Sequence, residues 1–395
     1  MPVRRTVALL CFVAFAVMGI TSSILGPTLT SLAASTNLPL ADAGILRAVQ
    51  QIGSVLATFV GGYLLSRYAL RSVIAPSVIL MAIGLLGMVA TGSLSVVLAA
   101  ELVLGVGTGV LNVAGNVAVS TLYAENAAPV LSALHTCFGV GLFAGPLLAG
   151  LALKQPDTWR TTYIVPAVAC VILGGLFASI LAVNLPSSDE PGTAASITEP
   201  PKIHPAVRWL PLLPMIVLLF MYNGAGNGMS DWIAPHLQLV AGASPGAAAQ
   251  IAALYGLALT TGRAIGVVVL KRLGNMPVLA LGIGLAVVGA ALIVMAGPTV
   301  GLVAVGVAMV GFGFSPIYPT VIAMAGQQQP ENRGAVTGIV AGIASIGGIL
   351  LPPMQGWVGG GHSGGMIITL LAAFIMVGAL TLVYRVDYHL RPSHI

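Results

Sequence analysis

The chain has 395 residues, of which 57% are hydrophobic and only 6% are charged, and its mean hydropathy is +1.03. A water-soluble protein of this length needs a polar surface, for which about a quarter of the residues are usually charged. The composition therefore excludes an ordinary soluble domain and predicts an integral membrane protein. The net charge of +5 is poor support for a nucleic-acid partner, because membrane topology accounts for it.

Twelve apolar stretches are each long enough for a membrane-spanning helix, which needs about 20 apolar residues. Their continuous apolar character argues against barrel strands, which would alternate at every second residue. The predicted fold class is therefore an all-α membrane protein. In chain order the predicted spans are 7–32, 41–66, 72–92, 95–122, 129–153, 160–184, 209–239, 246–270, 276–296, 299–325, 334–358 and 364–385.

Lysine and arginine residues are concentrated in alternate loops. With both termini in the cytoplasm, eleven of them fall on cytoplasmic segments, whereas Lys154 and Arg160 fall outside. This asymmetry agrees with the positive-inside rule. The first span is too long for a signal-peptide core and lacks a small-residue cleavage pattern, so we expect it to be retained. We predict a multi-pass protein of the cytoplasmic (inner or plasma) membrane with both termini cytoplasmic.

The second half of the chain repeats the first at an offset of about 206 residues, so that Gly105 and Gly107 correspond to Gly311 and Gly313. A repeated set of hydrophobic spans is typical of secondary transporters, in which two halves move about a central site. A segment rich in Pro, Ser and Gly separates the halves and predicts a flexible linker. The expected parts are an N-terminal six-helix bundle at 1–184, a cytoplasmic linker at 185–207 and a C-terminal six-helix bundle at 208–395.

The loop after the second span reads Gly-Tyr-Leu-Leu-Ser-Arg-Tyr-Ala-Leu-Arg over residues 62–71. It resembles the signature Gly-x-Leu-x-Asp-Arg-x-Gly-Arg-Arg of the major facilitator superfamily, with Gly62, Arg67 and Arg71 as the loop motif. Ser66 replaces the signature's Asp, which weakens the usual charge latch on the cytoplasmic side. The resemblance implies twelve helices in two pseudo-symmetric six-helix bundles and transport by alternating access.

Within that superfamily, three segments resemble the fucose permease-like sugar symporters and their sodium–glucose relatives. The resemblance implies an Asp in the first span and a Glu in the fourth for coupling and sugar binding, but Ser23 and Asn112 stand at those positions. Gly226 stands where the wider group often has an acid in the seventh span. Proton symport by the group's usual carboxylates is therefore not supported. The three segments are residues 105–116, 134–146 and 222–232.

Ionisable residues inside the spans are candidates for ion coupling or gating, since a charge near the bilayer centre costs about 2.5–3.5 kcal/mol. Arg47, Glu101 and Asp231 lie toward the outer side. An acid that faces a guanidinium could gate that side, but all three could also sit at the interface and snorkel to water. Arg263 lies deeper and could bind an anionic substrate or form a latch with His135, which could equally be structural.

Uncharged polar residues at the middle depth of the spans predict a sugar-like ligand, because amides both donate and accept hydrogen bonds and an aromatic ring can stack on a pyranose. Asn112 and Asn116 are four residues apart and so share a helical face. For any single residue, hydrogen bonding between helices is the alternative. The predicted substrate-binding residues are Gln50, Gln51, Asn112, Asn116, Tyr222, Asn223, Asn227, Trp232 and Tyr318.

The predicted function is secondary active transport of a small polar solute, a sugar or a related compound, with coupling to H⁺ or Na⁺ as an option. The alternatives are export of an amphipathic drug-like or lipid-like molecule, and a membrane receptor or scaffold that transports nothing. We expect no enzymatic activity, no metal and no cofactor beyond the coupling ion. The expected partners are the solute and membrane lipids, not nucleic acid, and we expect a monomer. The cysteines, without paired spacing, are expected to be small hydrophobes: Cys11, Cys137 and Cys170.

Overall fold

The structure is a computed structural model. Its regular structure is entirely helical in the described residues, which confirms the predicted fold class. Eleven helical segments among those residues are long and apolar enough to cross a membrane, and the remaining predicted span corresponds to α10, Pro245–Leu273. The predicted linker at 185–207 lies outside the described residues. The described residues are 2–123, 127–155, 158–184, 209–329, 332–359 and 365–390.

The chain divides into two compact units, one of Met1–Pro39 with Ile45–Pro200 and one of Leu40–Gly44 with Pro201–Ile395. In the first unit α4 packs against α5 and α7, and α1 packs against α6. The helices of this unit are α1 (Pro2–Ser23), α2 (Leu25–Ser35), α3 (Gly44–Arg67, apart from its first residue), α4 (Arg71–Ala90), α5 (Leu94–Leu122), α6 (Ala127–Ala152) and α7 (Thr161–Asn184).

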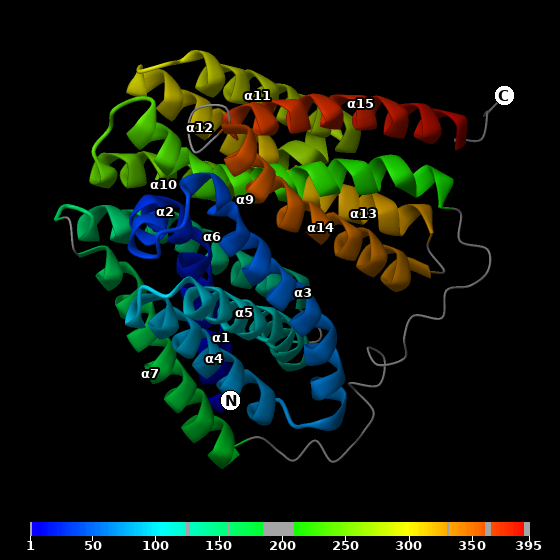
Figure 1. Cartoon of the computed structure of the whole chain (residues 1–395). Helices are drawn as coiled ribbons and strands as arrows, with labels where there is room; N and C mark the ends of the chain where they lie inside the picture. The colour runs from blue at the N-terminus through cyan, green and yellow to red at the C-terminus, as the bar shows by residue number, and fades with distance from the viewer. Residues whose placement is uncertain are drawn as a thin grey trace. The chain divides into compact units, whose positions relative to one another are not determined.

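In the second unit α9 packs against α14 and α15, while α11 packs against α12 and α15 (Figure 1). Besides α10, the helices of this unit are the short η1 (Leu40–Asp42), α9 (Leu213–Leu239), α11 (Asn275–Met295), α12 (Val300–Phe314), α13 (Ile317–Gln328), α14 (Arg333–Gly359) and α15 (Met366–Leu390).

Two of the predicted spans are interrupted by proline. The first is divided between α1 and α2 at Ile24, and the tenth is divided between α12 and α13 near Ser315. Proline has no N–H and its ring clashes with the carbonyl group four residues earlier. Pro27 therefore disrupts the helix at Ser23, and Pro316, which stands in the second gap, and Pro319 disrupt it near Ser315.

The internal repeat is visible where glycines allow helices to approach closely. A Cβ atom on Gly105 of α5 would lie 2.0 Å from the carbonyl oxygen of Gln50 in α3. A Cβ atom on Gly311 of α12, 206 residues later, would lie 2.7 Å from the carbonyl oxygen of Tyr255 in α10. Both distances are too short for a real Cβ atom, so each glycine is required for its helix contact. The repeat in sequence is thus also a repeat in packing.

The same equivalence joins Gly141 of α6 with Gly347 of α14. A Cβ atom on Gly141 would lie 2.0 Å from the carbonyl oxygen of Ala16 in α1, and one on Gly347 would lie 2.0 Å from that of Phe220 in α9. Small residues at such contacts let the backbones of membrane helices approach and interact. Gly141 therefore allows the close contact of α6 with α1, and Gly347 allows that of α14 with α9, which carries several of the predicted binding residues.

The segment that precedes α3 packs against the end of α14. Asp42 of η1 accepts a hydrogen bond from the indole nitrogen of Trp357 at 3.0 Å. A Cβ atom on Gly44 would lie 2.5 Å from the carbonyl oxygen of Pro352. These contacts explain why residues 40–44 belong to the second unit although they precede α3 in the chain.

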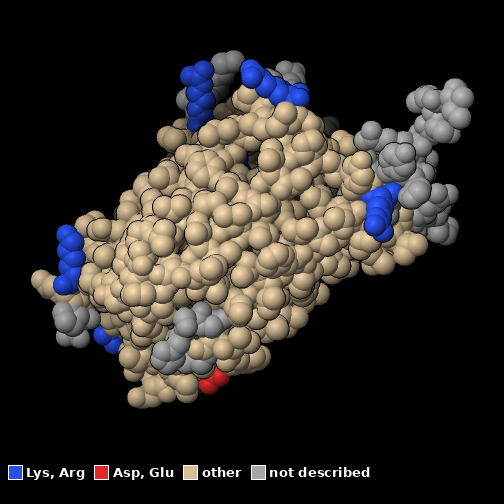
Figure 2. Space-filling model, turned by 90° about the horizontal axis from the view of Figure 1, so that it is seen from above, with Lys and Arg blue, Asp and Glu red and all other residues tan. Residues whose placement is uncertain are grey.

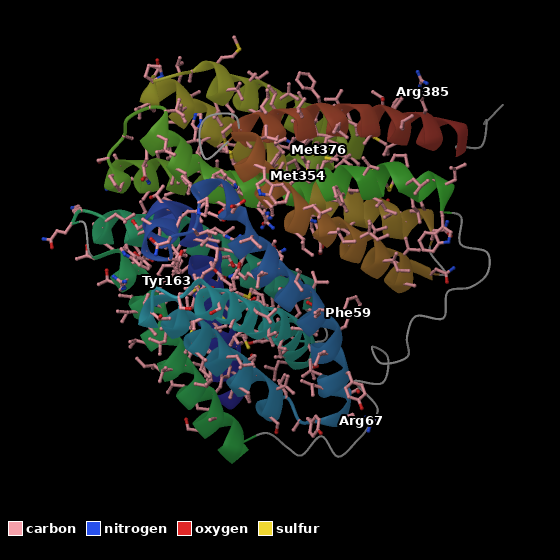
Figure 3. All side chains as sticks on the ribbon, in the orientation of Figure 1. Phe59, Arg67, Tyr163, Met354, Met376 and Arg385 are labelled. Atoms are coloured by element: carbon pink, nitrogen blue, oxygen red, sulfur yellow. The ribbon has the colours of Figure 1, made fainter. Side chains whose placement is uncertain are left out.

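Charged side chains are scarce on the molecular surface. Figure 2 shows one face, on which Lys and Arg are few and are separated by wide areas without charge. Large apolar side chains lie on the outside, and Phe59 on α3 is 70% exposed (Figure 3). An exposed apolar surface of this kind is stable in lipid rather than in water. The surface therefore agrees with the membrane assignment.

Candidate functional site

Helices α9, α10, α12 and α13 of the second unit bring aromatic side chains together around Arg263. The ring centroid of Tyr222 lies 5.5 Å from that of Phe314 and 6.1 Å from that of Tyr318. Nη2 of Arg263 donates to the Tyr222 hydroxyl at 3.4 Å. The sequence predicted Tyr222, Tyr318 and Arg263 separately, and the structure brings all three into one place.

Tyr255 of α10 completes this group, which we call the Arg263 cluster: Tyr222, Tyr255, Arg263, Phe314 and Tyr318. Tyr255 lies within electrostatic range of both Arg263 and Tyr222. Its hydroxyl oxygen would be 3.2 Å from a Cβ atom on Gly226 of α9. The hydroxyl therefore lies beside the position where the resembled transporters often carry an acid. Sequence reasoning missed Tyr255, although its carbonyl contacts Gly311 as the carbonyl of Gln50 contacts Gly105.

The break between α12 and α13 positions this cluster. Phe314 is the last residue of α12, and Tyr318 is the second residue of α13. The break packs on α10 at Gly262, where a Cβ atom would lie 2.5 Å from the hydroxyl oxygen of Ser315. Gly262 directly precedes Arg263, so the close contact places the guanidinium beside the aromatic rings.

Two predicted amides continue the polar surface along α9. Asn223 and Asn227 are both half-buried, and their spacing of four residues puts them on one face of the helix. Asn223 directly follows Tyr222. The second unit thus offers hydroxyl, amide and guanidinium groups from neighbouring helical positions.

Asp231 and Trp232 lie farther along α9. They follow Tyr222 by nine and ten residues, which is about 14–15 Å along a helix axis. Asp231 is 1% exposed, and nine residues of rotation place it on the opposite face from Tyr222. The indole nitrogen of Trp232 donates to the carbonyl oxygen of Pro352 in α14 at 2.9 Å. The structure does not bring these two predicted residues into the Arg263 cluster, and the Trp232 N–H group is used in helix packing.

In the first unit, Arg47 of α3 binds the end of α1. Its Nη2 donates to the carbonyl oxygen of Ser22 at 2.8 Å, and its Nη1 donates to Oε1 of Gln50. Because α1 ends at Ser23, its last carbonyl groups have no partner within the helix, and a positive side chain satisfies them. Arg47 and Gln50 are 4% and 5% exposed. The amide of Gln50, predicted to bind substrate, is therefore engaged by Arg47.

Glu101 of α5 lies at the same level of the first unit as these residues. It is 1% exposed and precedes Gly105, the glycine that contacts the carbonyl of Gln50, by one helical turn. The neighbouring Gln51 of α3 is half-buried. The structure therefore gathers Arg47, Gln50 and Glu101 on two packed helices.

The other predicted residues of the first unit are more accessible. Nδ2 of Asn116 donates to Oδ1 of Asn112 at 2.8 Å, which confirms that the two share a face. His135 is exposed, and its ring lies edge-on to Phe15 at 5.8 Å between centroids. Within the ranges that the structure describes, no group of three or more His, Cys, Asp or Glu residues could hold a metal ion.

The predicted loop motif lies between α3 and α4. Gly62 is half-buried in α3, and Arg67 is exposed at its end, where the guanidinium lies 5.0 Å from the ring centroid of Tyr63 (Figure 3). Arg71 is the first residue of α4. The motif residues therefore mark a tight connection between two helices of the first unit.

The sequence model of the Major Facilitator Superfamily matches residues 11–352, and a second match covers 223–394. The chain belongs to the major facilitator superfamily. Members of this family are transporters and not enzymes, so the protein is an integral multi-pass membrane transporter of small solutes. The predicted family and the predicted lack of enzymatic activity are confirmed.

Relatives within this superfamily include proteins with and without a named solute. An uncharacterised transporter from Yersinia pestis is 27% identical over 346 residues, which are 85% of this chain and 86% of that protein. The sodium-dependent glucose transporter 1 of Rattus norvegicus is 32% identical over 149 residues, which are 38% of this chain and 30% of that protein. The chain thus matches less than a third of the length of the glucose transporter.

Solved structures of superfamily members share the fold. A bacterial homologue of the human lysosomal transporter Spinster has a TM-score of 0.78 at 14% identity, with all of both chains covered. The xylose transporter XylE from E. coli has a TM-score of 0.74 at 13% identity, covering 97% of this chain and 99% of that one. These likenesses establish the architecture of two six-helix bundles.

The Arg263 cluster combines polar groups with aromatic rings. Tyrosine hydroxyls donate and accept hydrogen bonds, and the guanidinium of Arg263 donates only. The ring of Tyr318 is half-buried, and its face is a surface on which C–H groups can pack. Apolar walls with a few convergent polar groups are typical of small-molecule sites.

Proposed function

We propose that this transporter carries a small polar solute of the sugar class across the membrane by alternating access, and that the solute binds at the Arg263 cluster. The observation that carries the proposal is the convergence of Tyr222, Tyr255 and Tyr318 on one half-buried guanidinium. Tyrosine hydroxyls and a guanidinium can form hydrogen bonds with the hydroxyl groups of a sugar, and aromatic side chains can pack against its ring.

The nature of the relatives supports the same solute class. One relative is named as a sodium-dependent glucose transporter, and one protein of the same fold is a xylose transporter. The half-buried Asn223 and Asn227 lie on α9, the helix that also carries Tyr222, and their amides can serve hydroxyl recognition as both donors and acceptors.

We further propose that transport is coupled to an ion, H⁺ or Na⁺, through Asp231. A carboxylate that is 1% exposed on a membrane helix is a group that can take up and release a cation during a transport cycle. We also propose that both termini lie in the cytoplasm, because this placement puts most of the Lys and Arg residues on that side.

A counterflow experiment tests the proposed function. The purified protein is reconstituted into liposomes loaded with an unlabelled sugar, and entry of the same labelled sugar is followed for a panel of hexoses, pentoses, polyols and sugar acids. We expect saturable counterflow with at least one of them. Failure of the whole panel, together with thermal stabilisation of the protein by lipids or amphipathic drugs, would instead indicate an exporter of amphipathic molecules.

A further inference from the structure

Arg263 is an arginine whose donors are largely unused. Its hydrogen bond to Tyr222 is 3.4 Å long, beyond the usual N–H···O range of about 2.7–3.2 Å. Its Nε atom is buried and has no hydrogen-bond partner among the described residues. No ion pair of Arg263 is found in those residues either.

Arg47 in the first unit is a guanidinium engaged by groups of its own unit. Its two terminal nitrogens donate to the carbonyl oxygen of Ser22 and to Oε1 of Gln50. Arg47 is thereby held between α1 and α3. Arg263 has one long bond to a neutral hydroxyl, so helix packing does not account for its charge.

A guanidinium is protonated at every physiological pH, so the side chain of Arg263 stays positively charged. The Tyr222 hydroxyl offsets part of its desolvation, but a hydroxyl group does not balance a positive charge. No carboxylate among the described residues pairs with Arg263, so an anionic ligand can supply the opposite charge. The planar fork of arginine matches the two oxygens of a carboxylate, with two parallel hydrogen bonds.

We propose that the Arg263 cluster binds the carboxylate of a monoanionic solute, whose hydroxyl groups are recognised by Tyr222, Tyr255 and Tyr318. The solute is then a sugar acid or a similar hydroxy acid rather than a neutral sugar, an inference that rests on the function proposed above. The cluster holds one cationic side chain, so a single carboxylate balances it, whereas a dianionic phosphate leaves an excess negative charge.

The first arm of the test uses the wild-type protein alone. Binding of glucuronate, its neutral amide glucuronamide, glucose and glucose 6-phosphate is measured by isothermal calorimetry in detergent. We expect glucuronate to bind on the order of 10- to 100-fold more tightly than glucuronamide, because only the acid offers charge-assisted hydrogen bonds. Equal affinities would overturn the inference, and tighter binding of glucose 6-phosphate would overturn the choice of a carboxylate.

The second arm compares two variants. Arg263→Gln removes the charge, and it is expected to lower the affinity for glucuronate on the order of 10- to 100-fold and the affinity for glucuronamide by clearly less, because only the acid loses charge-assisted hydrogen bonds. Thr261→Val is the matched control on α10, because its hydroxyl donates to the carbonyl of Leu257 within the same helix at 2.7 Å. Thermal unfolding of both variants identifies any loss of folded protein, and the wild-type comparison stands without them.

The outcomes separate the two proposals. If neutral sugars bind as tightly as glucuronate and Arg263→Gln changes neither, the solute-carrier proposal stands and the carboxylate inference is wrong. If none of the four probes binds and no sugar of the whole panel shows counterflow, the proposed sugar-class transport is wrong, and the inference fails with it.

Discussion

Replacing Gly347 by alanine is expected to disturb the binding site without touching any of its side chains. The added Cβ atom would lie 2.0 Å from the carbonyl oxygen and 2.8 Å from the carbonyl carbon of Phe220. Both atoms belong to the backbone of α9, so no rotamer change relieves the clash, and α9 must move away by roughly 1 Å or more. Overpacking of this kind costs about 1–3 kcal/mol. Tyr222 follows Phe220 by two residues and would move with the backbone.

Gly342→Ala is the matched control, because this glycine lies in the same helix and a Cβ atom there meets nothing within 4 Å. Alanine in a helix interior is favoured over glycine by roughly 0.5–1 kcal/mol, so this variant is expected to be at least as stable as the wild type. Thermal unfolding in detergent and counterflow in liposomes measure the two effects. Equal stability and equal half-saturation in the two variants would refute this account of how α14 positions α9.

Three further changes test other parts of the structure. Arg47→Met leaves the carbonyl of Ser22 and the amide of Gln50 unsatisfied, so a loss of about 2–5 kcal/mol of stability is expected. In thermal unfolding this loss should exceed that from Gln51→Leu. An equal loss in the two variants would contradict the role of Arg47 in binding the end of α1. Trp232→Phe removes the bond to Pro352 and is expected to cost about 1–3 kcal/mol, with unchanged solute affinity; a large loss of affinity would place Trp232 in the site. Asp231→Asn is expected to abolish gradient-driven accumulation while sparing exchange, and unchanged accumulation across several pH and sodium values would exclude Asp231 as the coupling acid.

The membrane fold could be predicted from the sequence because long apolar runs have few alternative structures. Each predicted span coincides with one or two helices of the structure. The interruptions at Ile24 and Ser315 depend on a balance that the runs do not reveal. Many membrane helices continue through proline when neighbouring helices satisfy the freed carbonyl groups, so Pro27 and Pro319 alone did not decide the matter.

The candidate site could be predicted only in part, because the sequence does not show which partner a polar side chain chooses. Gln50 is a mid-depth amide that fits a sugar site, but its amide is held by Arg47 three residues earlier. Trp232 fits a stacking platform, but its N–H group binds Pro352, 120 residues away. Tyr255 was missed because a tyrosine in an apolar helix resembles ordinary packing.

Whether the Arg263 cluster holds the transported solute is tested most directly by counterflow with Tyr318→Phe. This variant keeps the ring that lies 6.1 Å from Tyr222 and removes only the hydroxyl. The half-saturation concentration for the best solute of the panel is expected to rise about three- to tenfold, the loss of one hydrogen bond. Tyr384→Phe, on the exposed side of α15, is expected to leave it unchanged. The same half-saturation concentration in the wild type and in Tyr318→Phe would contradict the placement of the solute in this cluster.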